Sequence, residues 1–204
     1  MIKDLGPRVA SVWEGLRPET RKMLVGVLQS KTAPMPPPAQ RYSYDAHADW
    51  ELSRLLSALD EQSKSPDSKA NDELLNEISA LADTCVRLLE SQSGSAEVFI
   101  QLAERAIRKH DYNKLDTLAD RLAERFSAGE IAEIVRQTEL PQIRAIAYET
   151  LAMLDVRDIV PLLDDPLYAD IAANALEQKA FEFESDEARD ALEQYDYEND
   201  VRGE

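Results

Sequence analysis

The sequence is poor in the residues that most often carry chemistry. Its 204 residues include one cysteine, Cys85, and two histidines, His47 and His110. A single cysteine excludes an internal disulfide and a cysteine-cluster metal site, and we expect it to be a packed, inert thiol. Neither histidine belongs to a Glu-x-x-His or His-x-x-x-His pattern.

Further absences point the same way. Asp45, His47 and Asp49 could offer metal ligands, but residues two positions apart on a helix point in different directions and cannot converge on one ion. The chain contains no nucleophile elbow, no P-loop and no dinucleotide-binding glycine pattern. We therefore expect a non-enzymatic protein with no metal and no cofactor.

Glycine is also scarce, at six residues, and alternating β-branched runs are few. Alanine, leucine, glutamate and arginine are abundant instead, which predicts an all-α fold. No stretch approaches the 18 uninterrupted apolar residues of a membrane span, and the first residues lack the apolar run of a secretory signal. The expectation is a cytoplasmic protein without membrane contact.

Positive charge is in short supply. There are 23 Lys and Arg residues against 40 Asp and Glu residues, a net charge of −17. This charge repels phosphate backbones and anionic lipid, so nucleic acid is disfavoured as a partner. Two stretches depart from the average: residues 1–31 carry +3 and residues 182–204 carry −8. Each is either a docking segment or a solvated face.

Composition divides the chain into four parts. A proline cluster, Pro34 and Pro36 to Pro38, forbids helix and favours extended polyproline II. This stretch is either a stiff spacer or a ligand for a proline-recognising groove. We predict an N-terminal helical hairpin (1–31), a Pro-rich linker (32–44), a helical-repeat domain (45–184) and an acidic capping helix and tail (185–204).

Within the repeat domain, polar residues mark the expected helix starts. Asp45, Asn71 or Asp72, Asp111 and Ser127 precede apolar residues at helical spacing and are candidate N-caps. The apolar residues expected in the first of these helices are Trp50, Leu52, Leu55, Leu56 and Leu59. From Asp111 onward the connections are short, which predicts antiparallel helices packed in series.

The clearest repetition lies between Leu140 and Ala180. Pro141 opens one apolar-periodic segment and Pro166 opens another about 25 positions later. Apolar and small residues occupy the same relative places after each proline. Between the two segments, Asp155 is expected to cap a short helix that continues through Leu163. The sequence thus predicts repeated two-helix units.

The segment Pro141 to Leu151 resembles the second helix of a HEAT-type repeat. Ile143, Arg144, Ala147 and Leu151 occupy the motif's places, with Thr150 where alanine is usual. The next unit keeps the aspartate, the proline and the small residues but departs at Tyr168-Ala169. The short spacing is similar to the HEAT-like repeats related to bilin lyases. The resemblance implies an α-solenoid, a fold whose members mostly bind other macromolecules.

Five residues are candidates for partner binding. Arg144 and Tyr148 lie off the apolar stripe of their helix and are residue types enriched at interface hot spots. In the rival interpretation, Arg144 pairs with an acid of a neighbouring repeat. Asp116 and Asp120 share one helical face, a pairing that an acidic helical protein also produces by chance. Asn174 completes the set.

The leading hypothesis is therefore a protein–protein interaction scaffold. Its acidic surface would select a protein partner with a basic patch. Two alternatives rest on fold analogy: a nucleic-acid-acting HEAT-like enzyme of the glycosylase type, and a chromophore-handling or small-molecule enzyme of the bilin-lyase type.

Overall fold

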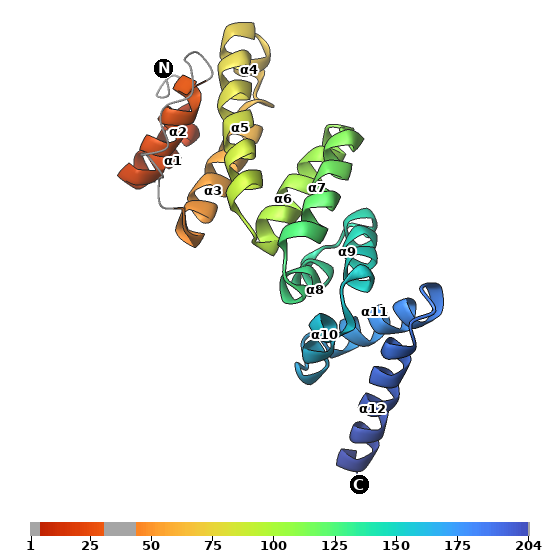
Figure 1. Ribbon diagram of the computed structural model, residues 1–204. Helices are drawn as coiled ribbons and strands as arrows, with labels where there is room; N and C mark the ends of the chain where they lie inside the picture. The colour runs from red at the N-terminus through yellow and green to blue at the C-terminus, as the bar shows by residue number, and fades with distance from the viewer. Residues whose placement is uncertain (1–4, 31–43, 204) are drawn as a thin grey trace. The chain divides into compact units, whose positions relative to one another are not determined.

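The computed structural model describes residues 5–30 and 44–203, and all the regular structure in those residues is helical (Figure 1). The all-α prediction is confirmed.

The chain forms two compact units, Met1–Ser93 and Gly94–Glu204. The helices of unit 1 are α1 (Pro7–Gly15), α2 (Pro18–Ser30), α3 (Ala46–Gln62), α4 (Pro66–Lys69) and α5 (Asp72–Gln92). Those of unit 2 are α6 (Ala96–Arg108), α7 (Tyr112–Arg125), α8 (Ala128–Gln137), α9 (Pro141–Met153), α10 (Val156–Ile159), the 3-10 helix η2 (Val160–Asp164), α11 (Ala169–Glu182) and α12 (Asp186–Gly203).

In unit 1, α3 packs against α1 on one side and α5 on the other, and α2 also contacts α5. The apolar stripe of α3 is fully buried at Leu52, Leu55, Leu56 and Leu59. Burial of a leucine side chain contributes roughly 1.5–3 kcal/mol, so this stripe holds the unit together. The helices of the predicted hairpin, α1 and α2, are therefore held by contacts with α3 and α5, and the hairpin itself stays a prediction.

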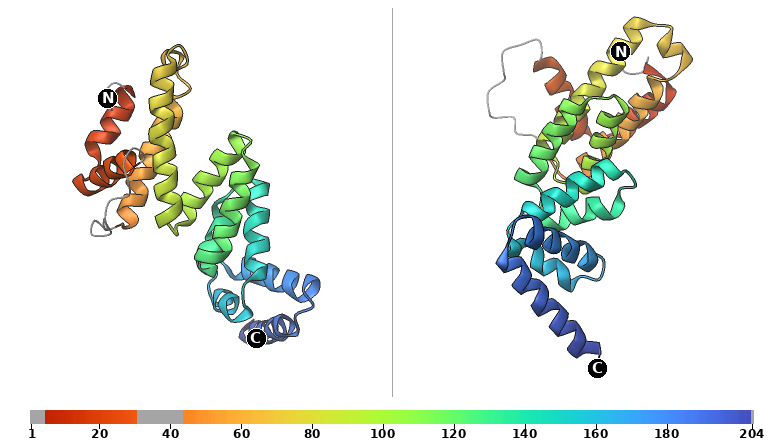
Figure 2. Two further views of the ribbon diagram at one scale, coloured as in Figure 1. Left: turned by 45° about the horizontal axis from the view of Figure 1, so that its top comes forward. Right: turned by 90° about the vertical axis from the view of Figure 1, so that its right-hand side faces the viewer.

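In unit 2, most packed helix pairs are one or two helices apart along the chain, and α6 with α9 and α8 with α11 are three apart. α6 contacts α7 and α8, α7 contacts α9, and α9 contacts α8 and α11. Figure 2 shows α8 and α9 side by side. The expected stripe of α9 is buried at Ile143, Ala147 and Leu151, all fully inaccessible to solvent. The HEAT-like solenoid itself stays a prediction.

The predicted caps explain most helix starts. The side chains of Asp45, Asn71, Asp111 and Ser127 each accept a hydrogen bond from a backbone N–H in the first turn of α3, α5, α7 and α8. Asp155 differs, because it makes no side-chain cap hydrogen bond and instead accepts one from Arg157 at 2.9 Å.

Three other local expectations need correction. The stretch Ser63 to Asp72, whose polar composition predicts a loop, contains the short helix α4, which Ser65 caps. Pro166 does not open α11. It lies in a turn in which the Asp165 carboxylate accepts from Leu167 N at 2.9 Å, and the helix begins at Ala169. Trp50 does not join the apolar stripe of α3 and is 53% exposed. Apart from Tyr44, the predicted linker lies outside the described residues.

Candidate interaction surface

The two leading sequence candidates lie on α9 but do not form a cluster. Arg144 is exposed, and its Nη2 donates to the Thr138 carbonyl oxygen at 2.6 Å, in the turn before its own helix. Tyr148 is half-buried one turn further on. The bond to Thr138 occupies part of the guanidinium without linking it to an acid of another helix. The roles of Arg144 and Tyr148 in binding stay predictions.

The remaining sequence candidates are also exposed but lie on other helices. Asp116 and Asp120 lie on α7, and Asn174 lies on α11. The Asn174 amide donates to the Asp170 carbonyl oxygen at 2.6 Å, within the same helix. Their roles in binding stay predictions.

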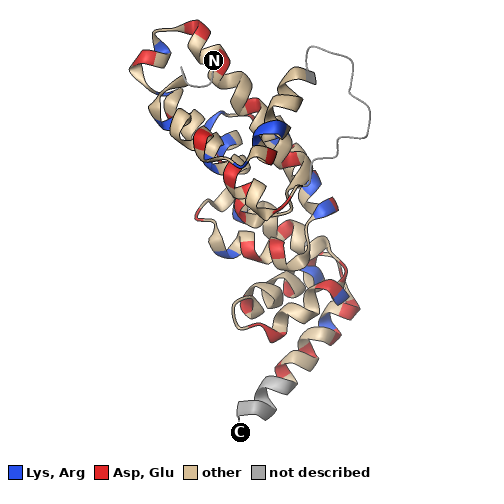
Figure 3. Ribbon diagram, turned by 90° about the vertical axis from the view of Figure 1, so that its left-hand side faces the viewer, with Lys and Arg blue, Asp and Glu red and all other residues tan. Residues whose placement is uncertain are grey.

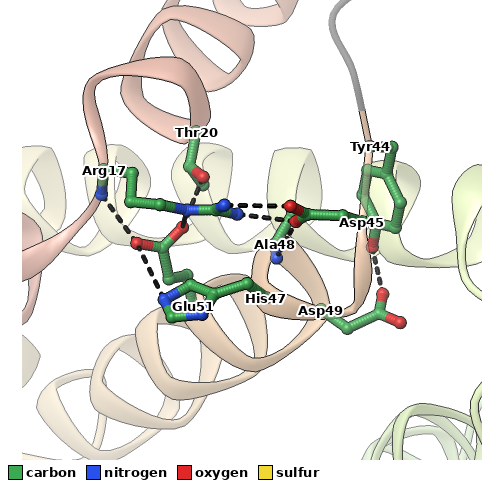
Figure 4. Close-up of polar contacts among 8 residues, drawn as sticks. All are labelled: Arg17, Thr20, Tyr44, Asp45, His47, Ala48, Asp49 and Glu51. Carbon is green, nitrogen blue, oxygen red and sulfur yellow. Dashed lines mark hydrogen bonds and ion pairs between the residues drawn. The ribbon is translucent and has the colours of Figure 1, made fainter.

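The most connected polar cluster lies in unit 1, where α2 begins against α3 (Figure 4). The Glu51 side chain is only 2% exposed. Its carboxylate accepts from the Arg17 backbone N–H at 2.6 Å, from Arg17 Nε at 3.2 Å and from the Thr20 hydroxyl. Burial alone would raise the pKa of Glu51, but the hydrogen bonds from Thr20 and Arg17 outweigh it and lower that pKa.

Arg17 also forms an ion pair with Asp45 at the surface. Arg17 Nη1 and Nη2 donate to the two oxygens of Asp45 at 2.9 and 2.6 Å. This bidentate pairing lowers the pKa of Asp45 well below its usual value and raises that of Arg17. Tyr44 donates to Asp49, and His47 Nε2 lies 3.9 Å from Glu51. Asp45, His47 and Asp49 therefore have different partners, in accord with their predicted divergence.

Unit 2 has a comparable cluster around Glu133 on α8. Arg136 Nε donates to Glu133 at 2.6 Å, and the Tyr168 hydroxyl donates at 2.9 Å. The hydrogen bond from Arg136 is the main reason that the pKa of Glu133 falls to about 2. The same carboxylate raises the pKa of Tyr168. Glu51 and Glu133 are thus held ionised by donors of their own chain. Each of these carboxylates joins neighbouring segments of its own unit.

Trp50 lies at the centre of an exposed aromatic cluster on α3. The Arg54 guanidinium lies 4.4 Å from the indole centroid, and the His47 ring contacts the indole edge-on at 5.5 Å. Residues 47, 50 and 54 share one helical face, opposite the buried leucines. Because Arg54 covers part of the indole, this aromatic side chain is already supported within the chain.

A larger apolar exposure lies where α11 turns into α12. Phe181 is 88% exposed and Phe183 is 53% exposed, and Met153 at the end of α9 is 63% exposed. Lys179 joins the two helix ends, because its Nζ donates to the Ala152 carbonyl oxygen at 3.1 Å and lies 5.8 Å from the Phe183 ring centroid. We call Phe181, Phe183 and the turn Glu184–Ser185 the aromatic corner (Figure 1).

The turn of the aromatic corner has a fixed backbone. Glu184 adopts φ 52, in the left-handed region, and the N–H of Phe183 bonds to the Lys179 carbonyl oxygen at 3.1 Å. Ser185 then caps α12 by accepting from Ala188 N at 3.3 Å. Hydrogen bonds on both sides of the turn therefore hold the backbone that carries the two phenylalanines.

The sequence contained a signal for the aromatic corner that periodicity alone does not interpret. Ala172, Ala175, Leu176 and Ala180 form the buried stripe of α11. Phe181 follows this stripe by one position and therefore points away from the packed side. The signal is therefore two large apolar residues in Phe-Glu-Phe-Glu that fall off the buried stripe of α11 and remain exposed.

Other kinds of site find no support in the described part of the chain. Residues 5–30 and 44–203 contain no group of three His, Cys, Asp or Glu side chains arranged to hold a metal. No helix in those residues is long and apolar enough to cross a membrane. Cys85 is buried, as the sequence predicted. No family model matches the chain, and comparisons with curated proteins and with solved structures found no similar protein.

Proposed function

We propose that the chain is a non-enzymatic protein-binding module that holds its partner at the aromatic corner. The observation that carries the proposal is the exposure of Phe181, 88% of which faces solvent. A phenylalanine so placed adds little to the packing of its own unit. Transferring its ring out of water on binding would contribute roughly 1.5–3 kcal/mol, enough for an interface hot spot.

The helical arrangement of unit 2 supports the same proposal. Its helices mostly contact neighbours one or two positions along the chain, as the units of a HEAT-like solenoid do. Short turns at the ends of such units commonly carry binding residues because a packed scaffold positions them. The aromatic corner is one of these turns, between α11 and α12.

Charge favours a protein partner over nucleic acid at this surface. Between residues 177 and 190 there are six acidic and two basic side chains. Acidic residues also continue along α12 (Figure 3, red). A phosphate backbone would be repelled here, whereas a basic protein surface would be attracted.

The experiment is site-specific cross-linking in the full chain. A photoreactive phenylalanine analogue replaces Phe181, and in a matched variant it replaces Tyr112, which lies on α7 and is 60% exposed. In extract from the source cells, the Phe181 position should give a discrete protein adduct that the Tyr112 position does not. Excess wild-type chain should compete the adduct away, and excess F181A/F183A chain should not. Equal adducts from both positions, or no adduct, would refute the proposal.

A further inference from the structure

The shape of the aromatic corner indicates which side of the interface supplies the pocket. Phe181 projects into solvent over most of its surface, and Phe183 over half of its own. A flat partner surface could cover only one face of such a side chain. Burying both faces requires a concave surface on the partner, as at hot spots where an aromatic anchor fills a pocket.

The charges next to the rings indicate what surrounds that pocket. Glu182 and Glu184 flank Phe183 in the sequence and are exposed. Both basic residues of the corner already have partners: Lys179 donates to Ala152, and Arg189 donates to Asp186 and to the Ala180 carbonyl oxygen. Insertion of the rings would bring these glutamates to the rim of the pocket, where carboxylates are costly to desolvate without opposite charges.

Other acids add to this uncompensated charge. Among the described residues, Glu177, Glu184, Glu187 and Asp190 have no ion-pair partner. The last turn of α11 also presents the negative end of its helix dipole. With six acidic and two basic side chains between residues 177 and 190, the aromatic corner carries a net negative charge, although the first turn of α12 presents the positive end of its own dipole.

We infer that the partner of the aromatic corner is a protein surface with an apolar pocket rimmed by lysine or arginine, into which Phe181 and Phe183 insert. This inference rests on the proposed function and specifies the chemistry of the partner. The chain thus provides the inserted side chains, and its partner provides the receptor. A second copy of this chain fits poorly, because its net charge of −17 repels the corner.

A synthetic host reproduces this chemistry in minimal form. Hepta-amino-β-cyclodextrin has an apolar cavity with a cationic rim, and β-cyclodextrin has the same cavity without the charge. Each host is titrated into the full chain labelled with ¹³C-phenylalanine and followed by NMR. The chain has four phenylalanines. Phe99 is buried and Phe126 is half-buried, so their rings serve as internal controls.

The expected result has three parts. Of the four phenylalanine signals, only those of Phe181 and Phe183 shift when either host is added. The cationic host binds at least about fivefold more tightly than the neutral host at low salt, and the preference shrinks at 0.5 M NaCl because exposed charges are then screened. E182Q/E184Q keeps neutral-host binding but loses most of the preference. E73Q/E77Q, which removes the same charge from exposed positions of α5, keeps it.

Several outcomes would overturn the inference. They are equal binding of the two hosts, a preference that E73Q/E77Q reduces as much as E182Q/E184Q, and a dimer in sedimentation that F181A/F183A dissolves. If Phe181 cross-links to a partner but the hosts show no charge preference, the proposed function stands and the inference about the pocket fails. If the hosts behave as expected but no cross-link forms, the proposed function fails, and the inference about its partner fails with it.

Discussion

Replacing Glu51 by alanine should destabilise unit 1 far more than replacing a typical surface glutamate. The Thr20 hydroxyl, in a side chain only 1% exposed, and the Arg17 backbone N–H would lose their acceptor. A buried polar group without a partner costs about 1–3 kcal/mol, so E51A should lower the free energy of unfolding by roughly 2–4 kcal/mol. E51Q keeps one acceptor oxygen and should cost about half as much.

Tryptophan fluorescence in urea measures this effect on unit 1 alone. The chain has two tryptophans, Trp13 and Trp50, and both belong to unit 1. Far-UV circular dichroism reports on both units together. The control is E61A, which breaks an exposed pair with Arg8 and should cost less than about 1 kcal/mol. An E51A midpoint no lower than that of E61A would refute the argument that the Glu51 cluster anchors α2.

The same cluster predicts how unit 1 responds to acid. The folded pKa of Glu51 is lower than its ordinary value of 4.5. Its contribution to stability is therefore complete above pH 4.5 and is lost as the pH falls below that value. The fluorescence midpoint of the wild-type chain should decrease over this range, whereas that of E51Q should change less. If the urea midpoints of the wild-type chain and E51Q fall in parallel as the pH decreases, Glu51 is not the titrating group.

Three further predictions concern unit 2. His110 adopts φ 56 in the turn after α6, which a hydrogen bond from Asp111 N to Ala106 O closes at 3.0 Å. Because glycine adopts a positive φ without strain, H110G should stabilise the unit by about 1 kcal/mol in thermal unfolding, whereas H110A should not. The pKa of Glu133 lies at about 2 instead of 4.5, so its contribution to the stability of the unit is complete above pH 4.5 and is lost as the pH falls toward 2. E133Q should therefore make unfolding less dependent on pH over this range, and an unchanged acid transition would contradict this. I134A removes a fully buried side chain and should lower the free energy of unfolding in urea by about 2–5 kcal/mol, whereas M153A, at an exposed position, should change it by less than about 0.5 kcal/mol. Similar losses in the two variants would contradict the burial pattern.

The helices could be predicted from sequence because their signals are local. Asp45, Asn71, Asp111 and Ser127 each cap a helix through a backbone N–H three residues later. The buried stripes repeat within a few turns of the same helix. Such patterns need no knowledge of distant segments, so periodicity and capping rules recover them.

The polar clusters and the exposed aromatic side chains were less predictable because they depend on segments that meet only in the folded chain. Glu51 is an acid inside an apolar stripe, and its partner Arg17 lies 34 residues earlier. Trp50 is a large apolar residue of the kind found in cores, but it lies off the buried stripe of α3 and is exposed. The exposure of Phe181 depends on where α12 turns away from α11. Periodicity therefore predicted Arg144 and Tyr148 as binding residues and passed over the aromatic corner.

The preference of the helices in unit 2 for near neighbours along the chain has a kinetic consequence. Contacts such as α6 with α7 and α8 with α9 bridge only short loops, and short loops close with little entropic penalty. Proteins dominated by such local contacts fold in microseconds to milliseconds. Unit 2 should therefore refold rapidly after dilution from urea, one helix pair providing the surface on which the next assembles.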